Sequence, residues 1–124
     1  ENKIPLFAMK PTIIFKNDEP YMGFGSPGGS RIMTTVLQVA LNVMDHDVNI
    51  AQAVHSPRIH HQWLPDVLMI EKGFGSDTEK LLKQKGYRLY PSSTMGSVQA
   101  IMRGGSYFYG SADPRRPNAG VATP

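Results

Sequence analysis

The stretch Gly25–Arg31 (GSPGGSR) carries the residue types best suited to chemistry in this chain. It joins a short extended segment to the longest apolar helical pattern, and glycine lets neighbouring N–H groups approach a ligand without hindrance from a side chain. A following helix adds unpaired N–H groups and the positive end of its dipole. The N–H groups of Gly28 and Gly29 therefore suit an oxyanion hole for acyl transfer. A loop that only permits close packing accounts for the same residues, and spacing alone leaves both readings open.

Two other chemistries fit the same glycine loop less well. Gly23, Gly25 and Gly28 match the dinucleotide pattern G-x-G-x-x-G, but the expected helix leads into a second short helix instead of the parallel strand that such a site needs. Neither Ser26 nor Ser30 completes the G-x-S-x-G pattern of a nucleophilic serine. We therefore expect Ser26 to be a turn residue and Ser30 to be a helix N-cap.

The histidines and arginines are predicted to be structural. His55, His60 and His61 are close in sequence, but the adjacent pair would point in different directions and no carboxylate lies at a usual ligand spacing, so we expect no metal site. Histidines in such a segment more often hold a loop by hydrogen bonds. Four arginines are expected to be solvated or to form structural ion pairs: Arg58, Arg103, Arg115 and Arg116.

Length and composition indicate one small globular domain. The chain has 124 residues, of which 40% are hydrophobic and 19% charged, and its net charge of +3 is spread along the sequence, so we expect no nucleic-acid partner. The absence of cysteine excludes disulfides and thiol chemistry. The apolar run at 39–44 is too short to span a membrane. The start Glu1-Asn2-Lys3 resembles neither a targeting segment nor an initiator, which predicts that the chain begins inside a larger product.

The elements that would position the glycine loop can be read from local patterns, and together they predict an α+β fold in a single segment, 1–124. The helix expected at 31–45 is apolar on almost every side, which predicts burial on most sides. Asn49 is expected to cap a helix at 50–55, and Ser76 with Glu79 to form a capping box. The predicted strands are 12–16, 20–24, 67–71, 87–90, 97–103 and 106–109, of which the first two and the last two are expected to form β-hairpins. The third predicted helix is 76–85, and the segment 58–65 is expected to be ordered but irregular.

The ordered motifs of the chain resemble the γ-glutamyltransferase (γ-glutamyl transpeptidase) family over nearly its whole length. These motifs are PLxxMxPT at 5–12, GSPGGSRI at 25–32, TTVLQ at 34–38, AV at 53–54, PRIHHQWLPD at 57–66, MGSVQA at 95–100 and DPR at 113–115.

The resemblance implies an N-terminal-nucleophile hydrolase, an αββα sandwich formed by autoproteolysis of a precursor into a large and a small subunit. This chain would be the C-terminal portion of the small subunit, with Gly28 and Gly29 supplying the oxyanion hole. The N-terminal threonine on the remainder of that subunit would attack γ-glutamyl amides such as glutathione and pass the acyl group to water or an amino acid. The family suggests a periplasmic or extracellular enzyme, and we expect no cofactor.

Two departures from the family pattern limit this expectation. The nucleophile is absent, because Thr12, Thr34 and Thr35 are internal and cannot use their own α-amines as bases, so the chain alone is expected to be inactive. Phe7 and Ala8 stand where the family has two substrate-binding serines. The substrate-binding positions carried over are thus Ser26, Phe7 and Ala8. An amidohydrolase or acylase of the same fold, or a catalytically dead binding or structural member, remains an alternative.

Overall fold

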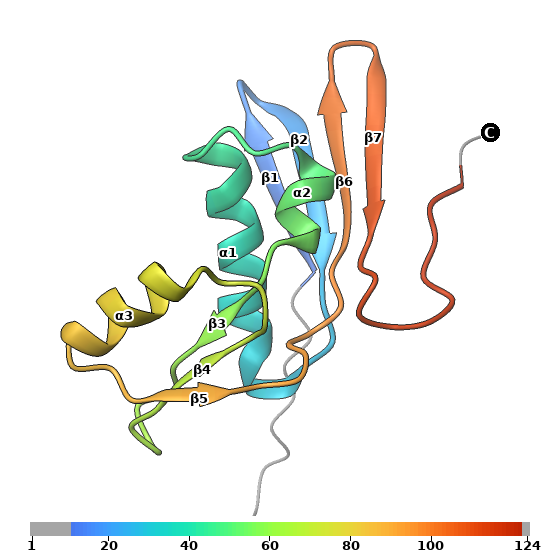
Figure 1. Cartoon of the computed structure of the whole chain (residues 1–124). Helices are drawn as coiled ribbons and strands as arrows, with labels where there is room; N and C mark the ends of the chain where they lie inside the picture. Colours follow the sequence, from blue (N-terminus) through green and yellow to red (C-terminus); the bar gives the residue numbers. More distant parts are fainter. Residues whose placement is uncertain (1–10, 123–124) are drawn as a thin grey trace, which may run out of the picture.

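The computed structural model describes residues 11–122 of the chain, in which two small sheets and three α-helices are packed together (Figure 1). The elements are β1 (Thr12–Lys16), β2 (Glu19–Gly25), a 3₁₀ turn η1 (Gly29–Arg31), α1 (Ile32–Met44), α2 (Ile50–His55), β3 (Ile59–His60), β4 (Leu68–Ile70), α3 (Ser76–Gln84), β5 (Leu89–Pro91), β6 (Gln99–Gly104) and β7 (Tyr107–Ala112). This arrangement confirms the α+β class.

The larger sheet is antiparallel, with strand order β1-β2-β6-β7. It consists of the two predicted hairpins, joined where Gly25 of β2 pairs with Gln99 of β6. Asn17 and Asp18 turn the first hairpin with φ of 53° and 61°, a left-handed conformation that Asn and Asp adopt more readily than other side chains. Because β2 is antiparallel to its neighbours and α1 runs on to α2, the arrangement agrees with the sequence argument against a dinucleotide fold.

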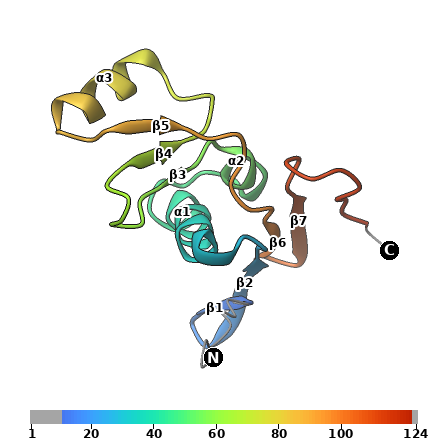
Figure 2. The same cartoon turned by 90° about the horizontal axis from the view of Figure 1, so that it is seen from below.

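The core lies between one face of this sheet and the helices α1 and α2, which Figures 1 and 2 show on the same side of the strands. Its buried residues are Met22, Phe24, Ile32, Val36, Val39, Val43, Ile50, Ala53, Val54, Val98 and Ala100. The expectation that α1 is buried on most sides is wrong for this chain. One face of α1 packs on the sheet, whereas Met33, Leu37 and Met44 on another face are more than half exposed.

The smaller sheet has the order β3-β4-β5, in which β4 pairs antiparallel with β3 and parallel with β5. α3 provides the crossover between the two parallel strands and packs on β5, at the edge of the molecule away from the larger sheet (Figure 2). The segment 58–65, expected to be irregular, contributes β3 because Ile59 and His60 pair with Ile70 and Met69. The strands expected at 67–71 and 87–90 are present as the shorter β4 and the slightly later β5.

Helix capping was predicted correctly at one site and wrongly at two. Asn49 caps α2 by accepting a 2.9 Å hydrogen bond from the N–H of Gln52. Ser30 does not cap α1, because η1 continues directly into the helix and Arg31 occupies the N-cap position without a side-chain bond. Ser76 is the first helical residue of α3, and Gly75 is its N-cap, so no capping box forms.

The outer face of the larger sheet is also apolar and uncovered in this chain. Ile13 of β1, Ile101 of β6 and Phe108 of β7 are 64%, 49% and 67% exposed, and they line one shallow pocket. Within residues 11–122, no helix is long and apolar enough to cross a membrane. The sheet thus has one face covered by helices and a second apolar face exposed.

Candidate active site and the ion cluster that supports it

The glycine loop adopts a backbone conformation that requires glycine. Gly28 has φ of 146° and Gly29 has φ of 59°, and both residues are exposed at the point where β2 gives way to α1. The N–H of Arg31 donates a 3.2 Å hydrogen bond to the carbonyl of Gly28, which closes the turn. Within residues 11–122, no acceptor pairs with the N–H of Gly28 or of Gly29. Two adjacent amides are thus available to a ligand oxygen.

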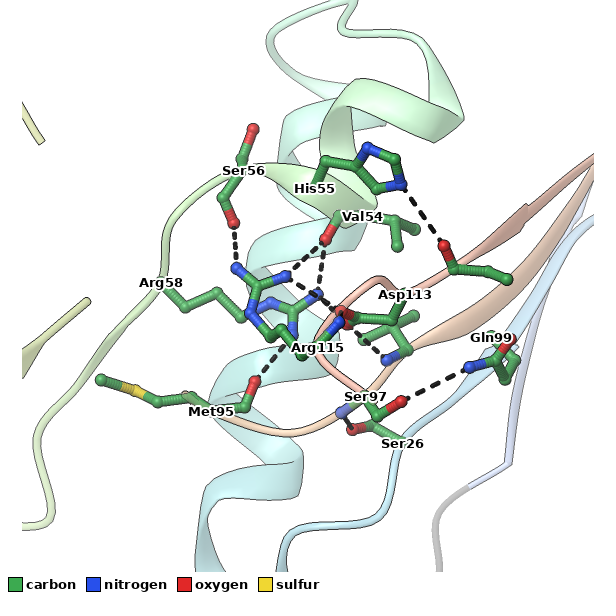
Figure 3. Close-up of polar contacts among 12 residues, drawn as sticks. Ser26, Val54, His55, Ser56, Arg58, Met95, Ser97, Gln99, Asp113 and Arg115 are labelled. Atoms are coloured by element: carbon green, nitrogen blue, oxygen red, sulfur yellow. Dashed lines mark hydrogen bonds and ion pairs between the residues drawn. The ribbon is translucent and has the colours of Figure 1, made fainter. Parts of the chain in front are cut away.

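Ser26 fixes the start of this loop to the segment before β6. Its hydroxyl accepts a 2.9 Å hydrogen bond from the N–H of Ser97 (Figure 3). The same hydroxyl donates a 2.8 Å bond to the carbonyl of Pro27. Ser26 thus lies in the irregular segment between β2 and η1. Its substrate-binding role remains a prediction.

Gly96 allows the two loops to approach each other. Its φ is 69°, and a Cβ there would lie 2.6 Å from Ser26 Oγ and 2.9 Å from Thr35 Cγ2. A Cβ on Gly28 would in turn lie 3.6 Å from Gly96 Cα. The position of the glycine loop therefore depends on the absence of a side chain at residue 96.

Two buried ion pairs lie behind these loops. Arg58 Nη2 is 2.7 Å from Asp113 Oδ2, and Arg115 Nη2 is 2.6 Å from Glu71 Oε2. Arg115 also contacts Asp113, at 3.1 Å, so the four side chains form one cluster, which we call the ion cluster. Arg58 and Asp113 are 1% and 0% exposed. Both arginines are thus structural ion-pair residues, one of the two roles expected from the sequence.

The ion cluster joins segments that are distant in the sequence. Arg58 donates to the carbonyls of Met95 and Val54, at 2.6 and 2.7 Å, which links α2 to the segment before β6 (Figure 3). Asp113 accepts a 2.7 Å bond from the N–H of Val98, in the same segment. Glu71 Oε2 accepts from the N–H of Arg58 at 2.9 Å, at the end of β4. Both sheets and α2 therefore converge on these charges.

The environment favours the charged states of Asp113 and Arg115, whereas burial opposes the charge on Arg58. Burial opposes the charge on Asp113, but the N–H groups of Val98 and Arg115 and the guanidinium of Arg58 outweigh it and lower the pKa of this carboxyl below its ordinary value of 3.8. Burial lowers the pKa of Arg58, and its bond to Asp113 opposes this effect. For Arg115, burial is outweighed by hydrogen bonds to Glu71 and Asp113, so its pKa is raised.

The other residues singled out in the sequence lie apart from one another. His55 contacts the carbonyl of Ala112, His61 contacts the exposed Asp66, and His60 is buried against α1. Among the described residues, no three histidine or acidic side chains are grouped to hold a metal ion. Arg103 pairs with Glu19 at the surface. Phe7 and Ala8, the altered positions of the family motif, lie outside the described residues.

Local sequence patterns do not assign Glu71 and Asp113 as partners of the two arginines. Nothing in such a pattern pairs residue 71 with a residue 44 positions later. Two sequence features point toward the ion cluster: the dipeptide Pro57-Arg58 and the tripeptide Asp113-Pro114-Arg115. Each places charged residues in a segment that otherwise has the composition of a turn.

The fold and the glycine loop define the class of the protein, and comparisons with known proteins define its family. A solved structure of Helicobacter pylori γ-glutamyltranspeptidase (T380A mutant) superposes with a TM-score of 0.86 and 50% identity, covering 93% of this chain and 64% of that chain. The fold is thus that of the N-terminal-nucleophile hydrolases. A sequence model of the γ-glutamyltranspeptidase family matches residues 2–123, and the chain belongs to that family.

Two further relatives show how much of a longer protein this chain matches. The glutathione hydrolase proenzyme of Escherichia coli K12 is 52% identical over 115 residues, which are 92% of this chain and 20% of the proenzyme. The cephalosporin acylase of Bacillus halodurans superposes with a TM-score of 0.79 at 28% identity, covering 89% of this chain and 21% of the acylase. The chain therefore spans about a fifth of the length of these two relatives.

Replacing one carboxylate of the ion cluster is expected to destabilise the fold strongly. Asp113→Asn leaves Arg58 buried without its counter-charge, which costs about 3–5 kcal/mol of unfolding free energy at pH 7. Because the pKa of Asp113 is lowered by folding, the wild-type chain loses this stabilisation as the pH falls below 3.8. The difference in unfolding free energy between wild type and variant should therefore be smaller at pH 3 than at pH 7. Urea denaturation at both pH values measures this.

The matched control for this prediction is Glu19→Gln, which breaks a 2.6 Å pair with Arg103 at the surface. Because that pair is exposed, its loss should cost about 0–1 kcal/mol. Equal losses in the two variants, or a difference that does not narrow in acid, would contradict the assigned role of Asp113.

Gly96→Ala is expected to destabilise the contact between the two loops. Its Cβ would overlap Ser26 and Thr35, and overpacking of this kind costs about 1–3 kcal/mol beyond the backbone strain. Gly86→Ala is the matched control, because Gly86 also has a positive φ, of 92°, yet a Cβ there meets nothing within 4 Å. Thermal unfolding of both variants compares them, and a similar loss in each would show that steric contact at Gly96 is unimportant.

Proposed function

We propose that this chain contributes the oxyanion hole and half of the fold to a γ-glutamyltransferase-like enzyme, as the C-terminal portion of its small subunit. The observation that carries the proposal is the pair of exposed N–H groups at Gly28 and Gly29, which have no acceptor within residues 11–122. Their positions are held by bonds from Ser97 to Ser26 and from Arg31 to Gly28, so the donors are arranged before a substrate arrives. Donors fixed in advance are what an oxyanion hole requires. Family membership supports the reaction type.

In the proposed reaction, the N-terminal threonine of the small subunit attacks the carbonyl carbon of a γ-glutamyl amide. The hydroxyl proton passes to the α-amine of that threonine, and the carbonyl oxygen becomes negative and accepts hydrogen bonds from Gly28 and Gly29. The C–N bond then breaks, and the amine leaves with the proton. Water or the amine of an amino acid attacks the resulting ester through a second oxyanion in the same place, which releases the threonine.

The rest of the proposed enzyme would cover the apolar faces that this chain leaves exposed. Met33, Leu37 and Met44 on α1, and Ile13 with Phe108 on the sheet, are each more than half exposed. Surfaces of this kind mark interaction sites in soluble proteins. The proposed occupants are the large subunit and the remainder of the small subunit, and the greater length of the relatives agrees with this assignment. The same remainder would supply the threonine, so the chain alone should be inactive.

A second candidate function is hydrolysis of a different acyl amide. A third candidate is that the protein is a catalytically inactive family member with a binding or structural role. The specific observation is the replacement of two family serines by Phe7 and Ala8, which removes two hydroxyl donors. A site that lacks donors for a substrate loses discrimination in its favour. The likeness in fold to a cephalosporin acylase agrees with a role for this architecture on non-glutamyl substrates.

Substrate preference separates these candidates. We expect the complete assembled enzyme to hydrolyse a γ-glutamyl anilide, and Phe7→Ser with Ala8→Ser to raise kcat/KM for it by about 10-fold, because each restored hydroxyl can donate to a charged substrate group. Release of the aniline, followed by absorbance, measures both rates. Turnover only of other acyl anilides would favour the acylase function. No turnover of any anilide by fully processed enzyme would indicate an inactive family member.

Gly28→Ala tests the oxyanion hole directly. At φ of 146° an alanine cannot keep the backbone conformation, so the loop must shift and kcat should fall about 100-fold or more. Gly105→Ala in the β6–β7 turn is the matched control, because Gly105 has φ of 64° with open space around it and lies in a different loop. Its kcat should equal that of the wild-type enzyme. An unchanged rate in Gly28→Ala would refute the proposed role of the loop.

A further inference from the structure

A buried histidine lies beside the glycine loop and is hydrogen-bonded on both sides of its ring. His60 Nε2 is 3.2 Å from Gln62 Oε1, and His60 Nδ1 is 2.8 Å from Thr34 Oγ1. His60 is 4% exposed, although it belongs to the two-residue strand β3. A buried polar ring with both nitrogens paired is fixed in orientation. The proposed reaction does not use this histidine directly.

The partners of His60 extend to the glycine loop through one hydrogen bond, from Ser30, and one close contact, of Thr34 with Arg31. Ser30 Oγ donates a 2.8 Å hydrogen bond to the same Gln62 Oε1, and Thr34 Oγ1 lies 3.1 Å from the carbonyl of Arg31. Ser30 and Arg31 are the two residues that follow Gly29. We call Ser30, Gln62, His60 and Thr34 the His60 network.

The protons of the network fit one arrangement of the neutral ring. Gln62 Oε1 can only accept, so His60 Nε2 carries the ring proton and donates to it. His60 Nδ1 is then an acceptor and takes the hydroxyl proton of Thr34, the shorter of the two contacts of that hydroxyl. The Ser30 hydroxyl supplies the second proton to Gln62 Oε1. With the hydroxyl of Ser30 and both ring nitrogens paired, the network has one defined geometry.

A neighbouring contact fixes the base of the network. Gln38 of α1 donates from Nε2 to the carbonyl of Ile59, at 2.8 Å, and accepts from the N–H of Ile59, at 2.9 Å. This pair of bonds holds β3 against α1 directly beside His60. The network therefore connects the loop to a rigid support and not to a second mobile segment.

We propose that the His60 network positions the N–H groups of Gly28 and Gly29 for catalysis, with Ser30 and Gln62 as positioning residues that never touch the substrate. This inference rests on the proposed function of the glycine loop. Because an oxyanion forms only during the reaction, misplaced donors lower kcat and leave KM almost unchanged. A network that served folding alone would change stability and not the rate per active site.

The test uses the complete processed enzyme, with active sites titrated and a γ-glutamyl anilide as substrate. Ser30→Ala removes the bond to Gln62, whereas Gln62→Met removes that bond and also the bond with His60. Both positions are exposed, so both variants should fold. Each is expected to lower kcat about 10-fold with KM within about twofold. Ser30→Thr retains a hydroxyl and Gln62→Glu retains an acceptor oxygen, so both should restore most of the rate. Ser56→Ala removes an exposed serine bond of α2, to the carbonyl of Gln52, and should leave kcat unchanged.

A double variant shows whether the two residues act together. Ser30→Ala with Gln62→Met should lower kcat no further than Gln62→Met alone, because Gln62→Met already breaks the bond to Ser30. Wild-type kcat in both single variants, or additive losses, would overturn the inference. If Gly28→Ala lowers kcat while the network variants do not, the network proposal alone fails. If Gly28→Ala also has no effect, the proposed oxyanion hole fails, so the two failures are distinguishable.

Discussion

The pairing of Arg58 with Asp113 inside the protein is the interaction on which the other parts depend. A folded protein can bury two charges almost completely only if the charges pair with each other and their remaining polar atoms form hydrogen bonds. Meeting that requirement brings together the end of α2, the end of β4, the segment before β6 and the segment after β7. Because that segment before β6 also carries the N–H of Ser97 that binds Ser26, the buried charges indirectly locate the glycine loop.

The chain leaves both its packing and its candidate site incomplete within residues 11–122. A helix that buries one face and exposes apolar side chains on others, and a sheet with an apolar outer face, leave more surface uncovered than a small domain usually does. The glycine loop likewise offers donors without a nucleophile. These two features agree with family membership, since the family relatives are about five times longer than this chain.

Local signals predicted the parts of the fold that are settled by near neighbours. The two hairpins and the Asn49 cap depend on turn chemistry within a few residues, and the structure confirms them. Local predictions were wrong where a residue distant in the sequence binds the hydrogen-bonding group that was assigned a local partner. Ser30 has the chemistry of an N-cap, yet its hydroxyl binds Gln62, 32 residues later. The strand pairing of Ile59 depends equally on a partner beyond any local window.

The sequence by itself determined the α+β class, the family motifs and the position of the glycine loop, because these depend on residue types and short spacings. It also predicted structural ion pairing or solvation for Arg58 and Arg115. Only the tertiary structure decided which carboxylates pair with them and that Ser97, Gly96 and Gln62 surround the loop. These partners are brought together by chain folding, so their spacing in the sequence carries no signal. Hydrogen bonds and ion pairs need contact distances, which three-dimensional packing sets.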